Sequence, residues 1–535
     1  MLRSDARRWA ILGAILLALL PLKVVTAPAD GPYRLDASYY FQIARHVANG
    51  DGLLTSVSLY HQGLDPLPAQ ARIYPLWPFL LGVAGRFVGL AAAATFLPPL
   101  LYFISLVLLY ELCWRLWRSM DPDALPLLPG PVPLDAGHLV VAAFATNPIF
   151  FMATTDPYTE ALAFTLAFGA LLAVDDAARK EQPITGFAAG LLAGLAFLAR
   201  SQMLVIVAAL LVVLTVASAR SRATRKIAFA AVLGVAGAVV PWVVFLRTHP
   251  SQTTDVGRFV TWVSSPSLTE YLVDRLPGLW IAFDPKSAFS YFSAFGATVV
   301  VVPLALIYAA VRLARDTPPP RVAVRPQHVL AIVAVAAAIL NHGILVHRHA
   351  QFFLPWLFGW RHGLPFVFAV AVAAVYLLTQ PSGTIRLAVA TLIALSIITG
   401  ALEALANAKR RPAPIPESFV QWVDSQSPAP TILTVRAQHM GMMTRGRYHW
   451  MDCNEPPQQT ERMLERLPID FVVVYEGEWG CRYLSGLQRL LEVHRQFAPP
   501  EAPRVWVLRR RNGDVPSRGA DGENEPSSTD PRPRP

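Results

Sequence analysis

Residues 227–246 read IAFAAVLGVAGAVVPWVVFL, twenty consecutive residues without a charge, with Arg225 and Lys226 before them and Arg247 directly after. A helix needs about 20 apolar residues to cross a bilayer. Of the 535 residues in the chain, 54% are hydrophobic and only 15% are charged, whereas soluble domains carry about 25% charged residues. The sequence therefore predicts an α-helical polytopic membrane protein.

Similar apolar blocks recur along the chain. The eleven expected spans are residues 9–27, 92–114, 137–152, 158–174, 185–199, 202–218, 227–247, 287–311, 327–346, 352–378 and 387–406. The first is favoured as an uncleaved signal anchor over a cleaved signal peptide. The block 74–90 contains Pro75, Pro78 and Arg86, and we expect it to form a helix at the membrane interface instead of a twelfth span.

Basic residues gather in alternate loops, which indicates the orientation. The clusters are Arg115 and Arg118; Arg179 and Lys180; Arg220, Arg222, Arg225 and Lys226; and Arg312, Arg315, Arg321 and Arg325. A cytoplasmic N-terminus puts all of them on the cytoplasmic side, as positively charged loops require. The loops 28–73 and 248–286 and the region from 408 then lie outside, with Lys409-Arg410-Arg411 as an exception. Topology thus accounts for the excess of 46 basic over 36 acidic residues, and nucleic-acid binding is not expected.

The region after the last span has the pattern of a small extracytoplasmic α/β domain. Strands are expected at 431–435, 471–475 and 505–508, and helices at 416–425, 457–467 and 484–494. The expected domains are a membrane domain, 1–407, which includes the loop 28–73, an α/β domain, 408–511, and a disordered tail, 512–535. Cys453 and Cys481 could pair in an oxidising compartment, or could be two free thiols. Cys113 is expected to be an inert packing residue.

The first outer loop contains an acidic residue beside an amphipathic segment. From Ala37 the chain is expected to form a helix with Tyr40, Ala44 and Val47 on one apolar face, which could lie on the membrane surface. Asp36 would cap its start and Gly50 would follow its end. Composition alone leaves open whether Asp36 is only a cap or a functional carboxylate.

A pair of acidic residues lies at the start of the expected span 158–174. Asp156 and Glu160 are four residues apart, on one face of a helix expected to begin at Pro157; Asp156 could also serve only as its N-cap. An unpaired carboxylate one turn into a membrane helix costs about 2–3 kcal/mol. Glu160 is therefore expected to meet Arg200, a polar cavity or a substrate.

Taken in order, several short motifs resemble the GT-C membrane glycosyltransferases, in the group of the lipid A aminoarabinose transferase and the protein O-mannosyltransferase relatives. The motifs are Asp36 with Tyr39-Tyr40 and Gly50-Asp51-Gly52-Leu53; Tyr74-Pro75-Leu76-Trp77-Pro78; Thr155-Asp156-Pro157-Tyr158-Thr159-Glu160-Ala161-Leu162; Leu198-Ala199-Arg200-Ser201; and Arg361-His362-Gly363-Leu364-Pro365. The resemblance spans roughly residues 9–406. Ala37 stands where many relatives have a second acid, which places in doubt any metal site built on an acidic pair. Leu76 stands where the family usually has the second proline of a Tyr-Pro-Pro motif, which precedes a helix next to the membrane.

This resemblance implies a function. A sugar would pass, with inversion, from a polyprenyl-phosphate-linked donor to a lipid, glycan or protein acceptor at the outer face of the bacterial cytoplasmic membrane. Asp36 would be the general base, and no metal or other cofactor is assigned. Substrate-binding residues would be Tyr39, Tyr40, Asp156, Glu160, Arg200, His347, Arg348 and His349. Among them, Arg200 and the run 347–349 would supply the cations that a departing phosphate needs.

Two other functions remain open. A transporter or flippase of a lipid-linked sugar would place polar residues near the middle of the bilayer and would contain repeated halves with broken helices. Here most span centres are Ala, Leu and Val, and no repeat is evident. A scaffold that displays the C-terminal domain would explain that domain but not the acids in the first loop. The enzyme is the favoured reading.

Overall fold

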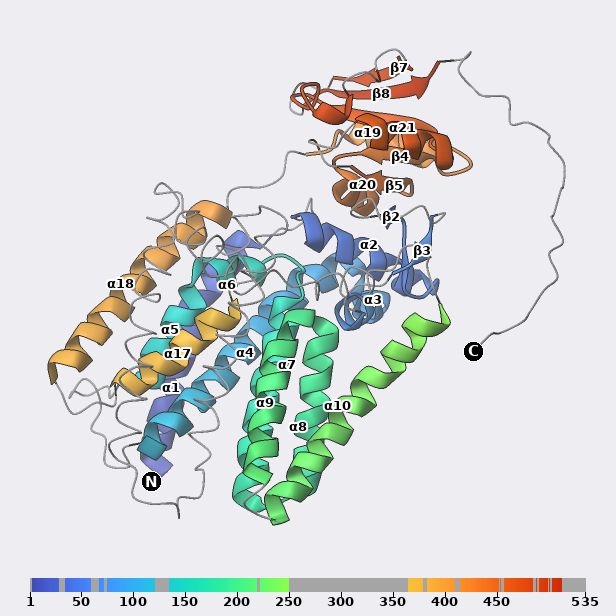
Figure 1. Ribbon diagram of the computed structural model, residues 1–535. Helices are drawn as coiled ribbons and strands as arrows, with labels where there is room; N and C mark the ends of the chain where they lie inside the picture. The colour runs from blue at the N-terminus through green and yellow to red at the C-terminus, as the bar shows by residue number, and fades with distance from the viewer. Residues whose placement is uncertain are drawn as a thin grey trace, which may run out of the picture.

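The computed structural model describes residues 2–27, 34–58, 67–71, 75–120, 134–218, 222–249, 364–378, 383–408 and 414–511, the last range with short gaps at 452, 454–456, 485–486, 488–489, 499 and 501–502. Within these residues a helical bundle carries a C-terminal α/β domain at one of its ends (Figure 1). We call this end of the bundle the domain end and the opposite one the far end. The predicted fold class is confirmed.

Twelve helices belong to the described part of the bundle. They are α1 (Leu2–Thr26), α2 (Leu35–Asn49), α3 (Leu76–Val88), α4 (Leu90–Met120), α5 (Ala136–Thr146), α6 (Pro148–Ala153), α7 (Glu160–Lys180), α8 (Pro183–Ala199), α9 (Leu204–Ser218), α10 (Arg222–Thr248), α17 (Leu364–Leu378) and α18 (Gly383–Ala408). A short 3₁₀ turn, η1 (Ser201–Met203), joins α8 to α9. The expected spans 287–311 and 327–346, and most of 352–378, lie outside the described residues.

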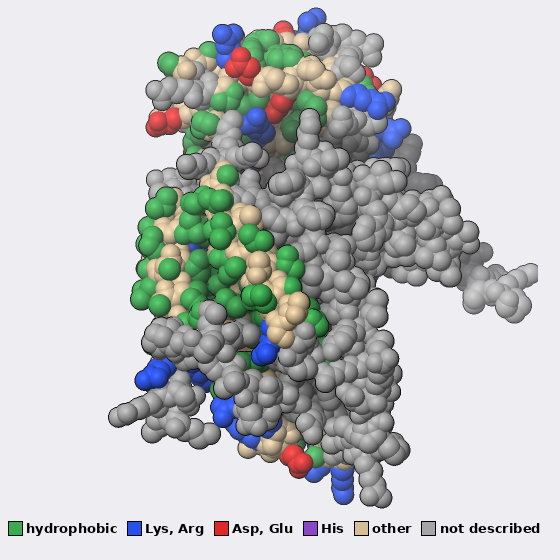
Figure 2. Space-filling model, turned by 90° about the vertical axis from the view of Figure 1, so that its left-hand side faces the viewer, with side chains coloured by type: hydrophobic (Ala, Val, Ile, Leu, Met, Phe, Trp, Pro, Cys, Tyr) green, Lys and Arg blue, Asp and Glu red, His purple; other side chains and the backbone are tan. Residues whose placement is uncertain are grey.

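Five of these helices are long and apolar enough to cross a membrane: α1, α4, α7, α10 and α18. The surface of α18 shows what such a helix exposes. Leu387, Leu395, Ile398 and Leu402 are each more than half exposed, which is the arrangement expected when lipid, not water, is the solvent. Figure 2 shows hydrophobic side chains over the described part of this face, with Lys and Arg beyond its lower edge. The protein is a multi-pass membrane protein.

Close approach between α8 and α10 depends on small residues. Gly186, Gly190 and Gly194 follow one another at intervals of four along α8, and a Cβ atom added to Gly190 would overlap the backbone of Ala231 on α10. Membrane helices commonly pack through such small residues, because lipid supplies no hydrophobic force between them. Together α7, α8, α9 and α10 form one half of the described bundle (Figure 1).

The predicted interface helix is present as α3, which packs against α2. Gly82 makes this contact possible, since an added Cβ would lie 2.5 Å from Val47 Cβ and 2.6 Å from Ala44 O. The apolar face of α2 is thus covered by α3 and is not free to lie on a membrane surface. One side of α3 remains exposed, with Phe79, Phe87 and Val88 at least half exposed.

Two helix starts differ from the sequence prediction. Arg34, not Asp36, is the N-cap of α2, and it makes no side-chain capping bond; Asp36 lies inside the first turn. The prediction of Gly50 as the residue after the helix is confirmed, because Gly50 has a φ of 92°. Helix α7 begins at Glu160 and not at Pro157. Residues 154–159 form a turn instead, so Asp156 is not a helix cap.

A mixed sheet forms the core of the C-terminal domain. Its strand order is β2-β5-β4-β6-β8-β7, with β2 (Val57–Ser58), β4 (Thr431–Thr434), β5 (Arg447–Trp450), β6 (Phe471–Tyr475), β7 (Leu491–Phe497) and β8 (Val505–Arg510). Strands β2, β5, β4 and β6 run parallel, and β8 and β7 are antiparallel additions. Helices α19 (Glu417–Ser425), α20 (Ala437–Met443) and α21 (Pro457–Arg466) and the 3₁₀ turn η6 (Arg482–Leu484) complete the domain.

All three predicted strands are confirmed, as are the helices at 416–425 and 457–467. The predicted helix 484–494 is wrong, because the 3₁₀ turn η6 ends at Leu484 and the last four residues of the range belong to β7. Leu491 and Phe497 are buried while the residues between them are exposed, so charged residues at an edge strand gave the segment its helical appearance. Cys453 and Cys481 are joined by a disulfide, and Cys113 is a buried free thiol.

Strand β2 comes from the first loop and not from the C-terminal region. Its residues pair with β5 in parallel, with Val57 opposite Tyr448 and Ser58 opposite His449. A second small sheet in the loop consists of β1 (Leu54–Thr55) and β3 (Ala69–Gln70). The first loop and the C-terminal domain therefore share one sheet, although some 390 residues separate Val57 from Tyr448 in the sequence.

Candidate functional site

Charged side chains from three segments meet at the domain end of the bundle. The start of α2, the turn 154–159 and the junction of α8 with η1 all carry ion-paired residues there. The pairs are buried, which is expensive in a membrane unless each charge has a partner. This cluster contains most of the predicted site residues that the structure describes.

Arg200 and Glu160 form the innermost pair. Arg200 ends α8 with an extended backbone, which turns its side chain back toward α7. Its Nη1 atom donates to Glu160 Oε1 and to Thr159 Oγ1, the latter at 3.2 Å. Glu160 is fully buried and Arg200 is 2% exposed. Of the three partners predicted for Glu160, which were Arg200, a polar cavity or a substrate, the structure shows Arg200.

Asp156 pairs with the residue that precedes α2. Arg34 approaches Asp156 Oδ2 with its guanidinium at 3.7 Å and with its backbone N–H at 3.4 Å. Asp156 is fully buried in this pair. Since Asp36 follows Arg34 by two residues, the contact fixes the first turn of α2, and with it Asp36, against the turn 154–159.

Lys23 extends this cluster from the end of α1. Its ammonium group donates to Phe151 O at 2.7 Å, to Thr154 Oγ1 at 2.8 Å and to Thr155 Oγ1 at 3.0 Å. Those three acceptors account for the burial of a lysine that is only 1% exposed. Sequence reasoning missed Lys23, although a lone cation in an otherwise apolar block was a signal.

The turn 154–159 is also tied to α3. Trp77 Nε1 donates to Pro157 O at 2.7 Å, and the indole is fully buried. Next to Pro157, burial together with the nearby charge of Asp156 raises the pKa of the Tyr158 phenol well above its usual range. Two of the sequence motifs, 74–78 and 155–162, thus meet directly.

The tyrosine pair lies one turn along α2 from Asp36. Tyr39 and Tyr40 are both buried, with ring centroids 6.2 Å apart. Asp36 is partly exposed, as a carboxylate that must reach a substrate would be. The predicted residues His347, Arg348 and His349 lie outside the described residues.

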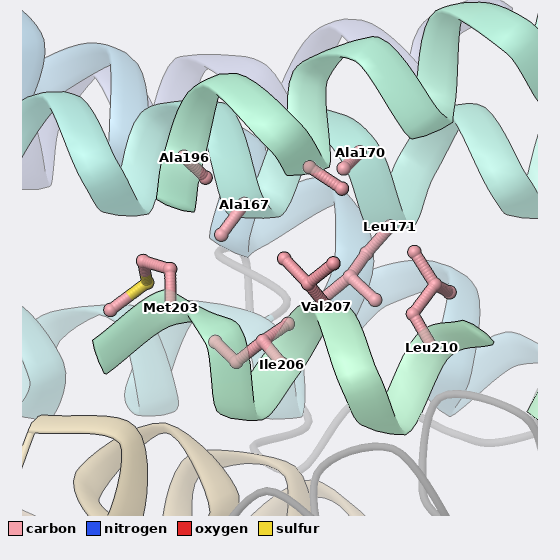
Figure 3. Close-up of a pocket in the computed structure, with 9 residues that line it drawn as sticks. Ala167, Ala170, Leu171, Ala196, Met203, Ile206, Val207 and Leu210 are labelled. Carbon is pink, nitrogen blue, oxygen red and sulfur yellow. The ribbon is translucent and has the colours of Figure 1, made fainter. Parts of the chain in front are cut away.

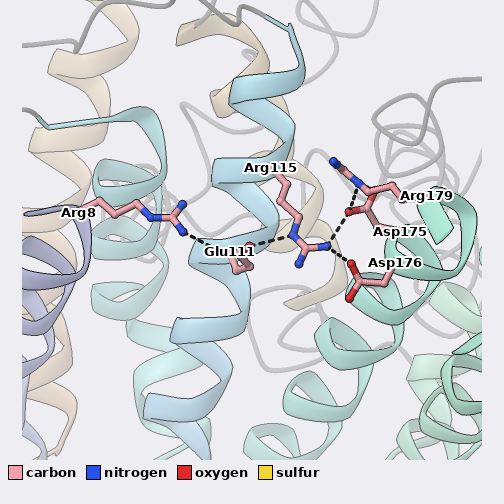
Figure 4. Close-up of polar contacts among 6 residues, drawn as sticks. All are labelled: Arg8, Glu111, Arg115, Asp175, Asp176 and Arg179. Atoms are coloured by element: carbon pink, nitrogen blue, oxygen red, sulfur yellow. Dashed lines mark hydrogen bonds and ion pairs between the residues drawn. The ribbon is translucent and has the colours of Figure 1, made fainter. Parts of the chain in front are cut away.

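The far end carries a second group of charges, which joins α1, α4 and α7 (Figure 4). Arg115 donates to Glu111 Oε1 at 2.9 Å and to Asp175 Oδ2 and Asp176 Oδ1 at 2.8 Å each. Arg8 and Arg179 lie at the two ends of this row of ion pairs. The basic residues near the C-terminal ends of α4 and α7 therefore lie at one end of the bundle, as the loop charges predicted.

An apolar gap lies between α7, α8 and α9 (Figure 3). Its lining consists of Ala167, Ala170, Leu171, Ala193, Ala196, Met203, Ile206, Val207 and Leu210. Without a polar atom, this gap could hold neither a sugar nor a phosphate. Among the described residues, no three His, Cys, Asp or Glu side chains lie close enough together to hold a metal ion.

Comparisons with known proteins bear on this arrangement. The family described as dolichyl-phosphate-mannose-protein mannosyltransferase matches residues 134–245, which contain Asp156, Glu160 and Arg200. The oligosaccharyltransferase of Archaeoglobus fulgidus, solved with Zn and sulfate, superposes with a TM-score of 0.53 at 16% identity, over 95% of this chain and 74% of that one. The arabinofuranosyltransferase AftD from mycobacteria gives 0.54 at 14% identity, over 95% and 40%. The protein has the GT-C fold.

The GT-C likeness is one of architecture and not of close sequence. ArnT from Cupriavidus metallidurans also superposes, with a TM-score of 0.48 at 14% identity, over 94% of this chain and 98% of that one; the fold assignment rests on the other two structures. A comparison with curated protein sequences found no match. The likeness to these solved structures is one of fold, and the family match covers residues 134–245.

Proposed function

We propose that the protein transfers a sugar from a polyprenyl-phosphate-linked donor to a hydroxyl or amine of a lipid, glycan or protein acceptor. The site lies at the domain end of the bundle, which we assign to the outer face of the cytoplasmic membrane of a bacterium. The observation that carries this proposal is the convergence there of Asp36, the Arg34–Asp156 pair and the Glu160–Arg200 pair. The disulfide in the attached domain supports an oxidising, extracytoplasmic location.

In the proposed reaction, Asp36 accepts the proton of the acceptor as its oxygen or nitrogen bonds to the anomeric carbon. The bond from that carbon to the phosphate breaks, and polyprenyl phosphate leaves with the electron pair. Attack from the face opposite the leaving group inverts the anomeric centre. Asp36 is partly exposed on the first turn of α2, so its carboxylate can reach an incoming acceptor.

We assign binding of the donor phosphate to Arg200 and the run 347–349. The other proposed substrate-binding residues are Tyr39, Tyr40, Asp156 and Glu160. Glu160 fixes the Arg200 guanidinium in place. A cation that is preorganised in this way stabilises developing phosphate charge without having to reorient during the reaction. Pairing with Glu160 also means that the site is nearly neutral before the donor enters, so that its cations are not left unpaired in the membrane.

Replacement of Asp36 by Asn tests the base assignment. Asp36 is not the N-cap of α2, so Asp36→Asn removes the carboxylate charge and keeps a side chain of the same size inside the first turn. The favourable interaction of an acid with the helix N-terminus, about 0.3–1 kcal/mol, is lost as well. Transfer should fall about 10²–10⁴-fold, while the amount of protein in the membrane stays the same.

The readout is mass spectrometry of envelope glycans and glycolipids. A deletion strain identifies the missing product, and plasmid-borne variants are compared by the amount of that product which they restore. Asp36→Glu is the matched control, because it keeps a carboxylate but moves it by one methylene and should retain part of the activity. A wild-type product level with Asp36→Asn would exclude the base assignment. A deletion strain with an unchanged profile of glycans and glycolipids would count against glycosyl transfer itself.

A further inference from the structure

The helix that carries Asp36 is held directly by the C-terminal domain. Arg45, on the polar side of α2, donates through Nη2 to Gly441 O at 2.8 Å and to Thr444 O at 2.9 Å, and through Nη1 to Met442 O at 3.1 Å. These carbonyls belong to the last turn of α20 and the residue after it. The C-terminus of a helix carries partial negative charge, so a guanidinium is well suited to cap it.

A second contact lies beside the first. Tyr448 N donates to Ser56 O at 2.8 Å where β2 joins the sheet. Val57 packs so closely on Gly441 that a Cβ atom added to this glycine would overlap Val57 Cγ2. Val57 is fully buried and β-branched, so it has little freedom to rotate away.

Other bonds tie β2 back to α2. Gln42 Nε2 donates to Thr55 Oγ1 at 2.8 Å, and Gln42 Oε1 accepts from Ser56 N at 3.0 Å. His46 Nε2 lies 2.7 Å from Ser56 Oγ. Helix α2, strand β2 and the C-terminal domain are thus joined by hydrogen bonds into one unit (Figure 1).

The other end of the same helix lies in the proposed site. Nine residues separate Asp36 from Arg45, which at 1.5 Å per residue is about 13 Å along the axis. Arg45 therefore lies too far away to touch a sugar that is in contact with Asp36. Its influence on transfer must act through the orientation of α2, which α3 holds on the opposite side through Gly82.

We infer that the C-terminal domain positions Asp36 for transfer and that Arg45 is the positioning residue which couples the two. The inference rests on the proposed function and adds to it a role for the domain. A misplacement of about 1 Å in a catalytic group can cost 10²-fold in rate, so a base on a short helix gains from a rigid clamp. The domain then serves as part of the catalytic unit and not as a separate appendage.

The test uses two changes that open this contact from opposite sides. Arg45→Ala removes the donors, and Gly441→Ala places a methyl group against Val57. Gly480→Ala is the matched control, because Gly480 lies in the same domain with open space around its Cα. Arg45→Lys keeps a cation that can donate to some of the carbonyls but cannot reproduce the planar fork.

Two measurements are made on each full-length variant. The first is the amount of restored product in the deletion strain. The second is amide hydrogen exchange of residues 35–40 in purified protein in nanodiscs. We expect Arg45→Ala and Gly441→Ala to lower the product about 10–100-fold and to speed exchange at the start of α2. Arg45→Lys should fall between Arg45→Ala and wild type in both, and Gly480→Ala should match wild type.

The results separate this inference from the proposed function. A wild-type product level with Arg45→Ala, or a lost product with unchanged exchange at residues 35–40, would overturn it. If Arg45→Ala does not accumulate in the membrane, Arg45→Lys and Gly441→Ala decide the question by the same two measurements. If Asp36→Asn proves fully active, the base assignment fails, and the exchange data still show whether the domain holds α2.

Discussion

The two ends of the membrane bundle use the same residue types in opposite ways. At the far end, Arg115 and its acidic partners are all partly exposed, with side-chain exposures between 15% and 34%. At the domain end, Glu160 and Asp156 are fully buried, and Arg200 and Lys23 are exposed by no more than 2%. Both ends contain arginine–carboxylate pairs, but in these pairs the carboxylates are fully buried only at the domain end.

Burial changes what such a pair costs and what it can do. An exposed ion pair contributes about 0–1 kcal/mol, because water and salt screen it and its long side chains lose entropy. Breaking a buried pair leaves an uncompensated charge and costs about 3–5 kcal/mol. The partly exposed pairs at the far end are therefore inexpensive contacts between helices, whereas the buried charges at the domain end are costly, and our proposal assigns them to the substrate site.

The largest expected effect separates the two ends by membrane side. Reporter fusions at Ser221, in the loop between α9 and α10, and at Ser418, at the start of the C-terminal domain, should be active on opposite sides of the membrane. The Ser221 fusion should report the cytoplasm, because its loop carries Arg220, Arg222, Arg225 and Lys226. An alkaline phosphatase and a fluorescent protein, each active on one side only, give an all-or-none result.

Fusions that report the same side would contradict the one-sided site. They would mean that the number of spans between the two positions is even and not odd, because two predicted spans outside the described residues are one span or because a single span was missed there. A fusion after Arg118, in the same set of basic loops, is the control for the cytoplasmic result.

The second prediction concerns the buried pair. Arg200→Ala should lower the stability of the protein by about 3–5 kcal/mol, because Glu160, which is fully buried, would lose the cation with which it is paired. Donor binding and transfer should fall together, since a phosphate contact present in the ground state is lost as well. The apparent Tm of purified protein in detergent and the amount of restored product measure the two effects.

Glu160→Gln combined with Arg200→Gln makes this prediction sharper. The double variant removes both charges, so its apparent Tm should recover toward wild type while transfer stays low. Recovery of transfer together with stability would show that the pair is structural only, and would remove Arg200 from the proposed donor site.

Sequence patterns predicted the bundle well because hydropathy and loop charge are local properties. Most helices at the predicted spans in the described residues, and the basic residues at one end, follow from hydropathy and loop charge, although the predicted span 137–152 is divided between α5 and α6. The strands of the C-terminal domain at 431–434, 471–475 and 505–510 follow from short hydrophobic runs. For Glu160, the argument that a membrane carboxylate needs a partner named Arg200 as one of three candidates. That argument works without a fold, because the cost of burial depends on charge and solvent.

Long-range contacts were beyond such reasoning. Strand β2 consists only of Val57 and Ser58, and nothing in the sequence near them indicates that Tyr448 and His449 are their partners. Arg45 shows no sign in the sequence that it caps α20. Asp36 was predicted as the N-cap because it precedes a helical pattern that begins at Ala37. In the structure the helix begins at Leu35, two residues before Ala37, and the N-cap Arg34 pairs with Asp156.

The smallest predicted effect completes the comparison at the far end. Arg179 donates from Nε to Asp175 at 2.9 Å and 3.0 Å, with its own side chain 49% exposed. The two residues are one helical turn apart, where such pairs contribute about 0.3–0.5 kcal/mol. Arg179→Ala should therefore lower the apparent Tm only slightly and leave the restored product unchanged. Lys180 remains next to position 179, so the cytoplasmic orientation of the loop should also be retained.

A loss of stability as large as that of Arg200→Ala would contradict this prediction. It would mean that the partly exposed ion pairs at the far end stabilise the protein as strongly as the buried pair, and that burial does not distinguish the two ends.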